Sequence, residues 1–217
     1  HYPIDQAGIV GLPVPGLEVK LVPNGGKLEA RVRGPNVTPG YYRDVQKTAQ
    51  AFDEEGYYCM GDALRFDDTE LPEKGLVFDG RVAEDFKLAS GTWVNVGKLR
   101  VQLMSAAKGL IQDAVLTGHD RDEIGALVFL HPSTAGLGNT EAVSALCNAL
   151  KQHNEGVGSG SSVRITRALI LKEPPSIEHG EITDKGYINQ RFVLQRRASE
   201  VQRLYAPALD ADVAKAQ

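Results

Sequence analysis

The stretch Gly80-Arg81-Val82-Ala83-Glu84-Asp85-Phe86-Lys87 separates two different sequence patterns. Before it, short runs alternate apolar and polar residues, which is the period of a half-buried β-strand. After it, longer segments place apolar residues three or four positions apart, as amphipathic helices do. We therefore predict an α+β protein with a β-rich part over 1–80 and a small α+β part over 81–217. Gly80 gives the backbone freedom to bend between the two parts.

The clearest element upstream of this stretch is a β-hairpin. Leu17–Pro23 and Leu28–Arg33 both alternate, and Asn24-Gly25-Gly26-Lys27 between them suits two adjacent residues with positive φ. The apolar face of the first strand carries Leu17, Val19 and Leu21. Three further elements are predicted before residue 80, namely a helical turn at Thr48–Phe52 and strands at Gly56–Met60 and Leu76–Phe78.

Downstream, helical and extended patterns are mixed. A long loop is predicted over Glu173–Gly186, and the tail after Pro207 is expected to fray. The predicted helices are Val96–Ile111, Thr140–Gln152 and Tyr187–Tyr205, and the predicted strands are Asp113–Gly118, Ile124–Leu130 and Val163–Leu171.

Composition excludes several functional classes. The chain has 24 Lys and Arg against 28 Asp and Glu, a net charge of −4, which argues against a nucleic-acid clamp with a basic face. Its apolar runs, such as Ala126–Leu130, are far shorter than the roughly 20 residues that cross a bilayer. The two cysteines and five histidines show no metal-binding spacing, so no metal site is predicted. Few cysteines also favour a cytoplasmic location.

Three segments taken together resemble a known family. Two of them are Gly34-Pro35-Asn36-Val37-Thr38-Pro39-Gly40-Tyr41-Tyr42 and Gly56-Tyr57-Tyr58-Cys59-Met60-Gly61-Asp62, and the third is the stretch from Gly80 to Lys87. In this order and spacing they resemble the late motifs of adenylate-forming enzymes, which include acyl- and aryl-CoA synthetases, luciferases and peptide-synthetase adenylation domains. Within that family, Glu84–Val94 and Gly180–Arg191 look most like a feruloyl-CoA synthetase group.

The resemblance implies roles for particular residues. Asp62 matches the family aspartate that accepts hydrogen bonds from both ribose hydroxyls, and an ionised carboxylate suits two donors. Arg81 matches an arginine that contacts the nucleotide. The family hinge follows this arginine, but Ala83 is an additional residue here, so either Glu84 or Asp85 could be the pivot.

Two further positions follow from the resemblance. Ser90, Gly91 and Thr92 correspond to the loop that lines the CoA tunnel. Lys185 matches the catalytic lysine, whose ammonium group would bridge the attacking carboxylate and the α-phosphate. In this chain the glycine follows the lysine, as Gly186, whereas in most of the family it precedes the lysine.

The implied reaction joins a carboxylic acid, ferulate or another hydroxycinnamate, to AMP and then to CoA. ATP, AMP, CoA and Mg²⁺ are the implied cofactors. The chain lacks the family's phosphate-binding loop, its adenine segment and its acyl pocket, and it begins with His1 instead of Met. We therefore expect it to be the C-terminal portion of a larger ligase, inactive alone, with the upstream large domain as its partner and Mg²⁺ ligands outside it. A ligase for another aryl or fatty acid, or a free-standing interaction module without chemistry, are the alternatives.

Overall fold

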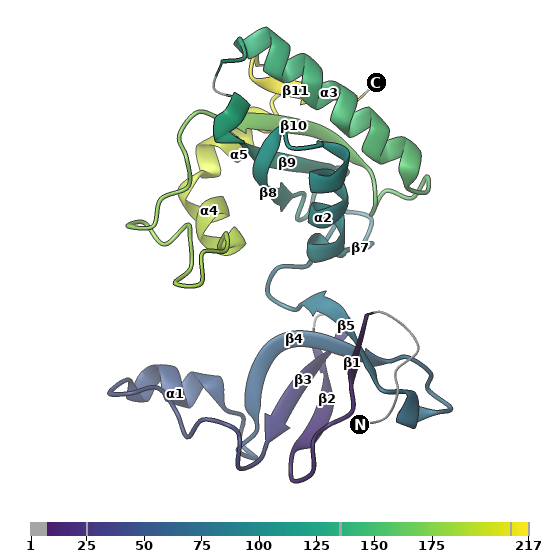
Figure 1. Cartoon of the computed structure of the whole chain (residues 1–217), viewed down its shortest axis with the longest axis vertical. Coiled ribbons are helices and arrows are strands. Elements are labelled where there is room, and N and C mark those ends of the chain that lie inside the picture. The colour runs from purple at the N-terminus through teal and green to yellow at the C-terminus, as the bar shows by residue number, and fades with distance from the viewer. Residues whose placement is uncertain (1–7, 25, 135, 209, 217) are drawn as a thin grey trace. The chain divides into compact units, whose positions relative to one another are not determined.

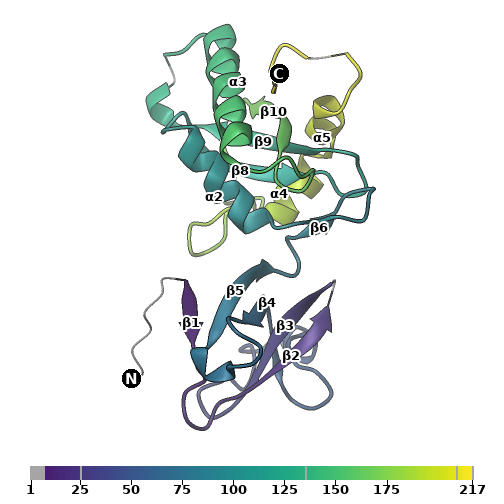
Figure 2. The same cartoon turned by 90° about the vertical axis from the view of Figure 1, so that its right-hand side faces the viewer.

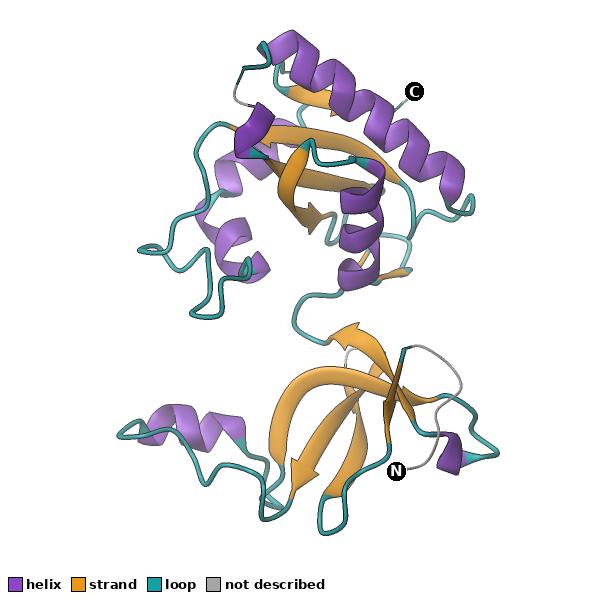
Figure 3. Ribbon diagram, in the orientation of Figure 1, coloured by secondary structure: helices purple, strands orange, loops and turns teal. Residues whose placement is uncertain are grey.

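The computed structural model describes residues 8–24, 26–134, 136–208 and 210–216. The chain divides into two units, unit 1 over His1–Ala83 and unit 2 over Glu84–Gln217. Figure 1 shows unit 1 in purple and blue and unit 2 in teal, green and yellow. The secondary structure is α+β, as predicted, with strands dominating unit 1 and both helices and strands in unit 2 (Figure 3).

Unit 1 is built on a five-stranded antiparallel sheet in the order β1-β5-β4-β3-β2. The predicted hairpin is confirmed, because β2 and β3 pair over their whole length and close at Asn24 opposite Lys27. Gly25, within the predicted turn, lies outside the described residues. The elements of unit 1 are β1 (Ile9–Gly11), β2 (Glu18–Asn24), β3 (Lys27–Arg33), α1 (Val45–Ala51), β4 (Tyr58–Phe66), η1 (Pro72–Lys74) and β5 (Leu76–Arg81).

The core of unit 1 is small. Ala30, Leu64 and Leu76 are buried, and Val19 and Leu21 pack against them from the predicted apolar face of β2. The predicted strand at Gly56–Met60 was wrong in its extent, since β4 runs from Tyr58 to Phe66. Partners on both sides, β3 and β5, carry the strand through the glycine at position 61, which has a φ of +73°.

Unit 2 is centred on a four-stranded sheet in the order β11-β10-β9-β8. Strands β9 and β10 are parallel, and the other neighbours are antiparallel. The elements of unit 2 are β6 (Phe86–Lys87), β7 (Trp93–Val94), α2 (Val96–Ala106), β8 (Ile111–Thr117), β9 (Ile124–Leu130), η2 (Pro132–Thr134), α3 (Asn139–Gly156), β10 (Ile165–Leu171), α4 (Gln190–Arg196), α5 (Ala198–Leu204) and β11 (Val213–Lys215).

Helices cover both faces of this sheet (Figure 2). Alternate residues of each strand point to opposite faces, so Leu116 and Val128 pack with α2 and α3 whereas Leu127 packs with α4 and α5. A strand covered on both sides is apolar throughout. This explains why every residue of β9 except Leu130 is buried.

Two sequence predictions at the C-terminal end were wrong. The single helix predicted over Tyr187–Tyr205 is interrupted at Arg197, which has φ −103° and ψ 35° and separates α4 from α5. The tail expected to fray after Pro207 instead forms β11, which pairs with β10. The edge of β10 thereby gains a hydrogen-bonding partner, which is a common way to protect an edge strand.

Candidate functional site

Asp62 and Arg81, the two residues expected at the nucleotide, lie opposite each other on β4 and β5 of unit 1. The Arg81 Nε atom is 3.5 Å from the Asp62 Oδ1 atom. Their side chains remain 61% and 31% exposed, respectively, so both keep surface for a ligand. Burial raises the pKa of the Asp62 carboxyl group, and the charge of Arg81 opposes that shift.

This pair fits a ribose in chemical terms. A carboxylate can accept hydrogen bonds from two vicinal hydroxyls, and the neighbouring guanidinium offers a planar set of donors. The local backbone is fixed beside the pair, because the Val82 N–H donates to the Gly61 carbonyl at 2.9 Å. The sheet register therefore brings the two predicted residues together from positions nineteen apart in the sequence.

The segment between the units begins directly after β5. Residues 82–84 form a turn. The Glu84 carbonyl accepts a hydrogen bond from Gln190 Nε2 at 3.3 Å. The Asp85 side chain is only 8% exposed, and its Oδ1 atom accepts a hydrogen bond from the Val96 N–H at 2.8 Å, at the start of α2. Asp85 is therefore fixed within unit 2.

Ser90, Gly91 and Thr92 form the exposed turn that joins β6 to β7 in unit 2. Gly91 has a φ of +81°, and a side chain at this position would meet no atom within 4 Å. The hydroxyl groups of Ser90 and Thr92 are 2.9 Å apart. Glycine is thus required here by the backbone conformation rather than by crowding within unit 2.

Lys185 lies in the exposed turn between Thr183 and Tyr187. The Gly186 N–H donates to the Thr183 carbonyl at 2.9 Å, and the Thr183 N–H donates to the Tyr187 carbonyl at 2.8 Å. Gly186 has a φ of +81°, a conformation that glycine adopts readily. The turn geometry therefore accounts for a glycine after the lysine, and helix α4 begins only at Gln190.

The group that anchors this turn was not predicted from the sequence. Glu181, four residues before Lys185, is fully buried, and Arg197 donates to its Oε1 and Oε2 atoms at 2.7 and 3.0 Å. The Ser176 N–H donates to Oε2 at 2.8 Å, and Arg196 lies 3.2 Å from the same atom. Burial alone would raise the pKa of Glu181, but these donors hold it at about 2. An acidic residue in a long loop followed by two adjacent arginines was the available signal, but spacing does not show that they pair.

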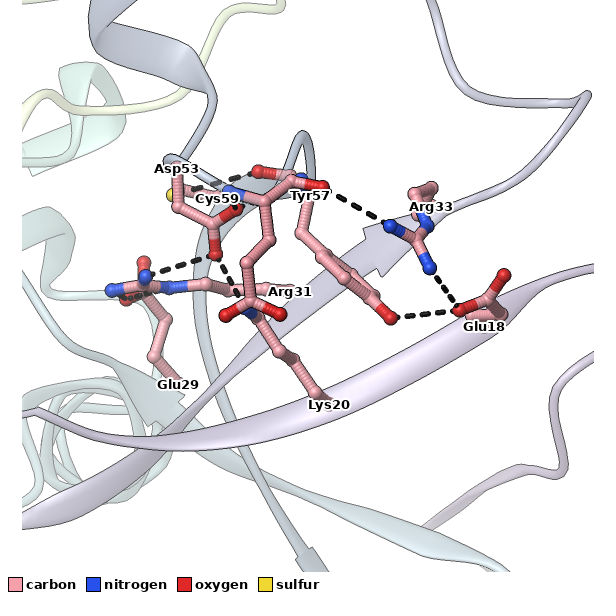
Figure 4. Close-up of polar contacts among 9 residues, drawn as sticks. Glu18, Lys20, Glu29, Arg31, Arg33, Asp53, Tyr57 and Cys59 are labelled. Atoms are coloured by element: carbon pink, nitrogen blue, oxygen red, sulfur yellow. Dashed lines mark hydrogen bonds and ion pairs between the residues drawn. The ribbon is translucent and has the colours of Figure 1, made fainter.

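A second polar cluster lies in unit 1 around Asp53, Lys20 and Arg31, and its contacts hold strands and a turn together (Figure 4). It lines an open cleft of about 500 Å³. Asp53 pairs with Lys20 at 2.8 Å and with Arg31 at 3.2 Å, so the Lys20 ammonium and these other contacts hold the pKa of Asp53 well below its usual value. Burial raises the pKa of the nearby Cys59 thiol, which disfavours a thiolate nucleophile. These contacts join β2 and β3 to the turn before β4.

Residues 8–24, 26–134, 136–208 and 210–216 contain no group of three or more His, Cys, Asp and Glu side chains placed to hold a metal ion. Within the same ranges, no helix is both long and apolar enough to cross a membrane.

The sequence motifs and the two-unit α+β fold agree with a protein of the adenylate-forming class. More specifically, the chain belongs to the family of AMP-binding enzyme C-terminal domains, whose sequence pattern matches residues 86–208.

Proteins of similar sequence or structure support this family assignment. The long-chain-fatty-acid–CoA ligase FadD15 of Mycobacterium tuberculosis is 30% identical, over 92% of this chain and 34% of its own length. The long-chain-fatty-acid–[acyl-carrier-protein] ligase AEE15 of Arabidopsis thaliana is 27% identical, over 92% and 29%. The adenylation domain of carboxylic acid reductase from Segniliparus rugosus, solved with AMP and a carboxylic acid, superposes with a TM-score of 0.70 at 25% identity, covering 90% of this chain and 32% of that one. The chain thus spans about a third of the length of these relatives.

Proposed function

We propose that this chain is the C-terminal portion of a ligase that activates a carboxylic acid as an acyl-adenylate and transfers the acyl group to a thiol. The observation that carries the proposal is the Asp62–Arg81 pair, because its partly buried carboxylate and exposed guanidinium lie side by side, where the family motif expects a ribose. The relatives named as acid–thiol ligases support the reaction class, and their greater length supports a further, upstream large domain.

Lys185 is proposed as the catalytic residue of adenylate formation. Its ammonium group would offset negative charge that develops between the attacking carboxylate and the α-phosphate. The exposed position of the lysine in a hydrogen-bonded turn is compatible with that role. The ligands of Mg²⁺ are proposed to lie in the upstream large domain, outside this chain.

The unit boundary is the proposed hinge. Asp85 is held by the first N–H of α2, whereas residues 82–84 form a turn directly before it. A rotation of unit 2 would therefore use the backbone of Val82–Glu84 with Asp85 moving as part of unit 2. The turn Ser90–Thr92 is proposed to face the pantetheine chain of CoA, since the hydrogen atoms of Gly91 leave room for close approach.

The acid is proposed to be a long-chain fatty acid rather than ferulate. The resemblance to feruloyl-CoA synthetases rests on two short segments, whereas the relatives named for long-chain fatty acids match over about nine-tenths of the chain. Both CoA and an acyl-carrier protein occur as acceptors in those names. A cytoplasmic location stays a prediction.

The test is Lys185→Ala in the full-length protein. Adenylate formation, measured as diphosphate release with a long-chain acid or ferulate, should slow by roughly 10²–10³. Thioester formation from supplied acyl-adenylate should be largely spared. Lys151→Ala, which removes an exposed lysine from α3, is the matched control and should leave both steps unchanged. Equal losses in both steps for Lys185→Ala would refute the assignment.

A further inference from the structure

The carboxylate of Glu181 joins the long loop of unit 2 to the junction of α4 and α5. Its four donors come from Ser176, at the start of the long loop, and from Arg196 and Arg197, at the junction of α4 and α5. Arg197 also donates to the Pro174 carbonyl at 3.1 Å and lies over the Phe129 ring on β9. Glu181 is therefore fixed against the sheet.

The backbone of Glu181 is hydrogen-bonded at the base of the turn that contains Lys185. The Glu181 N–H donates to the Ser176 carbonyl at 2.9 Å, and the Glu181 carbonyl accepts from the Asn189 N–H at 2.8 Å. Between them, Ile182 pairs with Ile188 in an antiparallel bridge. These bonds close the base of the loop on both sides, so the position of Lys185 depends on where Glu181 is held.

Stability alone is a weak reason for such a pair. Removing two charges from water is costly, and well-packed apolar residues often replace a buried ion pair without loss of stability. The pair does, however, offer a fixed bidentate geometry that apolar contacts do not provide. The break between α4 and α5 falls at Arg197 itself, so the helix is interrupted where this arginine turns toward Glu181.

We propose that Glu181 and Arg197 are positioning residues that hold the Lys185 turn in the geometry needed for adenylate formation. The inference rests on the proposed catalytic role of Lys185. Neither residue would touch the substrate, since the carboxylate is fully buried beneath the turn and the Arg197 side chain is 3% exposed. Misplacement of a catalytic group by about 1 Å can cost on the order of 10²-fold in rate.

The first measurement follows the turn itself in the 217-residue chain. Glu181→Gln should speed hydrogen exchange at the amides of Glu181, Thr183 and Asn189 by about 10-fold or more, because the base of the loop opens more often. The matched control is Asp113→Asn, which breaks another bidentate pair of unit 2, with Arg100 at 2.6 and 2.5 Å, far from the loop in sequence. It should change exchange at the same three amides by no more than about twofold.

The second measurement is a double-mutant cycle in the full-length protein. Glu181→Gln should lower kcat for adenylate formation by about 10- to 100-fold with little change in KM for ATP. In the Lys185→Ala background the same change should add less than about twofold, because a residue that acts through Lys185 has nothing left to position. If Glu181 had a purely structural role, Glu181→Gln would instead lower kcat by the same factor in the unchanged protein and in the Lys185→Ala background.

The outcomes separate this inference from the proposed function. If Lys185→Ala does not slow adenylate formation, the proposed catalytic role of Lys185 is wrong, and the inference is overturned with it. If Lys185→Ala slows the step but Glu181→Gln leaves exchange and kcat unchanged, or its effect multiplies fully with that of Lys185→Ala, the inference alone is overturned. Should Glu181→Gln fail to fold, Arg196→Ala removes only the half-exposed donor, and its smaller increase in exchange and smaller loss of kcat must show the same dependence on Lys185.

Discussion

Asp85→Ala should destabilise unit 2, and it distinguishes the two residues that the sequence left open as the pivot. The Asp85 side chain is buried and accepts a hydrogen bond from the N–H of Val96, a residue that is itself 1% exposed. Alanine would leave this buried donor without its carboxylate acceptor. A buried donor that loses its partner typically costs about 1–3 kcal/mol in the free energy of unfolding.

Two further variants, Asp85→Asn and Glu84→Ala, separate the contributions to this loss in the free energy of unfolding. Asp85→Asn keeps a side-chain oxygen near Val96 but removes the negative charge at the N-terminus of α2, which is worth about 0.3–1 kcal/mol. Glu84→Ala keeps the backbone carbonyl that accepts from Gln190, so we expect a loss of no more than about 1 kcal/mol. Asp85→Ala should therefore be the most destabilising of the three.

Urea unfolding of the 217-residue chain measures this directly. Trp93 is the only tryptophan, and it lies in β7 of unit 2, so its fluorescence reports on unit 2. With a typical urea dependence of about 1–3 kcal/mol per molar, the loss for Asp85→Ala should lower the midpoint by roughly 0.5–1.5 M without a change in slope.

The opposite ranking would refute the reasoning. If Glu84→Ala lowers the tryptophan midpoint as much as Asp85→Ala does, Asp85 does not anchor α2. A free energy of unfolding for Asp85→Ala within about 0.5 kcal/mol of that of the unchanged chain would have the same meaning, since that range is ordinary for surface substitutions. In either case the proposal that unit 2 rotates about residues 82–84 would lose its support.

Three further predictions concern the pH dependence of stability, the hinge and the activity of the isolated chain. Burial raises the pKa of Glu181, but its hydrogen bonds, led by those from Arg197, together outweigh burial and hold this pKa at about 2, below the usual 4.5. The ionised Glu181 therefore contributes on the order of 3 kcal/mol to the free energy of unfolding above about pH 4.5, and this contribution is lost as the pH falls toward 2. Urea midpoints at about pH 7 and pH 3 should therefore differ less in Glu181→Gln than in the unchanged chain, and equal differences would contradict this. Glu84→Pro in the full-length protein fixes φ near about −65° and should impair one half-reaction far more than the other, with Glu84→Ala as control; wild-type rates for both would place the pivot elsewhere. The isolated 217-residue chain should release no diphosphate from ATP and acid, and release above background would show that the missing phosphate loop is not needed.

Local sequence patterns predicted most of the secondary structure correctly. Alternation located β2 and β3, because side chains alternate between the two faces of a strand whatever its partners are. The apolar, β-branched runs of unit 2 located β8 and β9. Apolar spacing located α2 and α3 for the equivalent helical reason. The motifs identified Asp62 and Arg81 separately as candidate nucleotide-binding residues, and the structure then placed the Arg81 Nε atom 3.5 Å from the Asp62 Oδ1 atom.

Sequence periodicity does not identify the partner of a strand, a charged side chain or a helix end, and only the tertiary structure decided these partners. The tail becomes β11 because the edge of β10 accepts another strand, a condition that the tail's own residues do not reveal. The helix breaks at Arg197, the residue whose side chain pairs with Glu181, sixteen residues earlier. Asp85 is buried because α2 begins with an N–H directed at it. A local pattern records which face of a segment is buried, whereas ion pairs, caps and edge strands depend on groups that only folding brings within hydrogen-bonding distance.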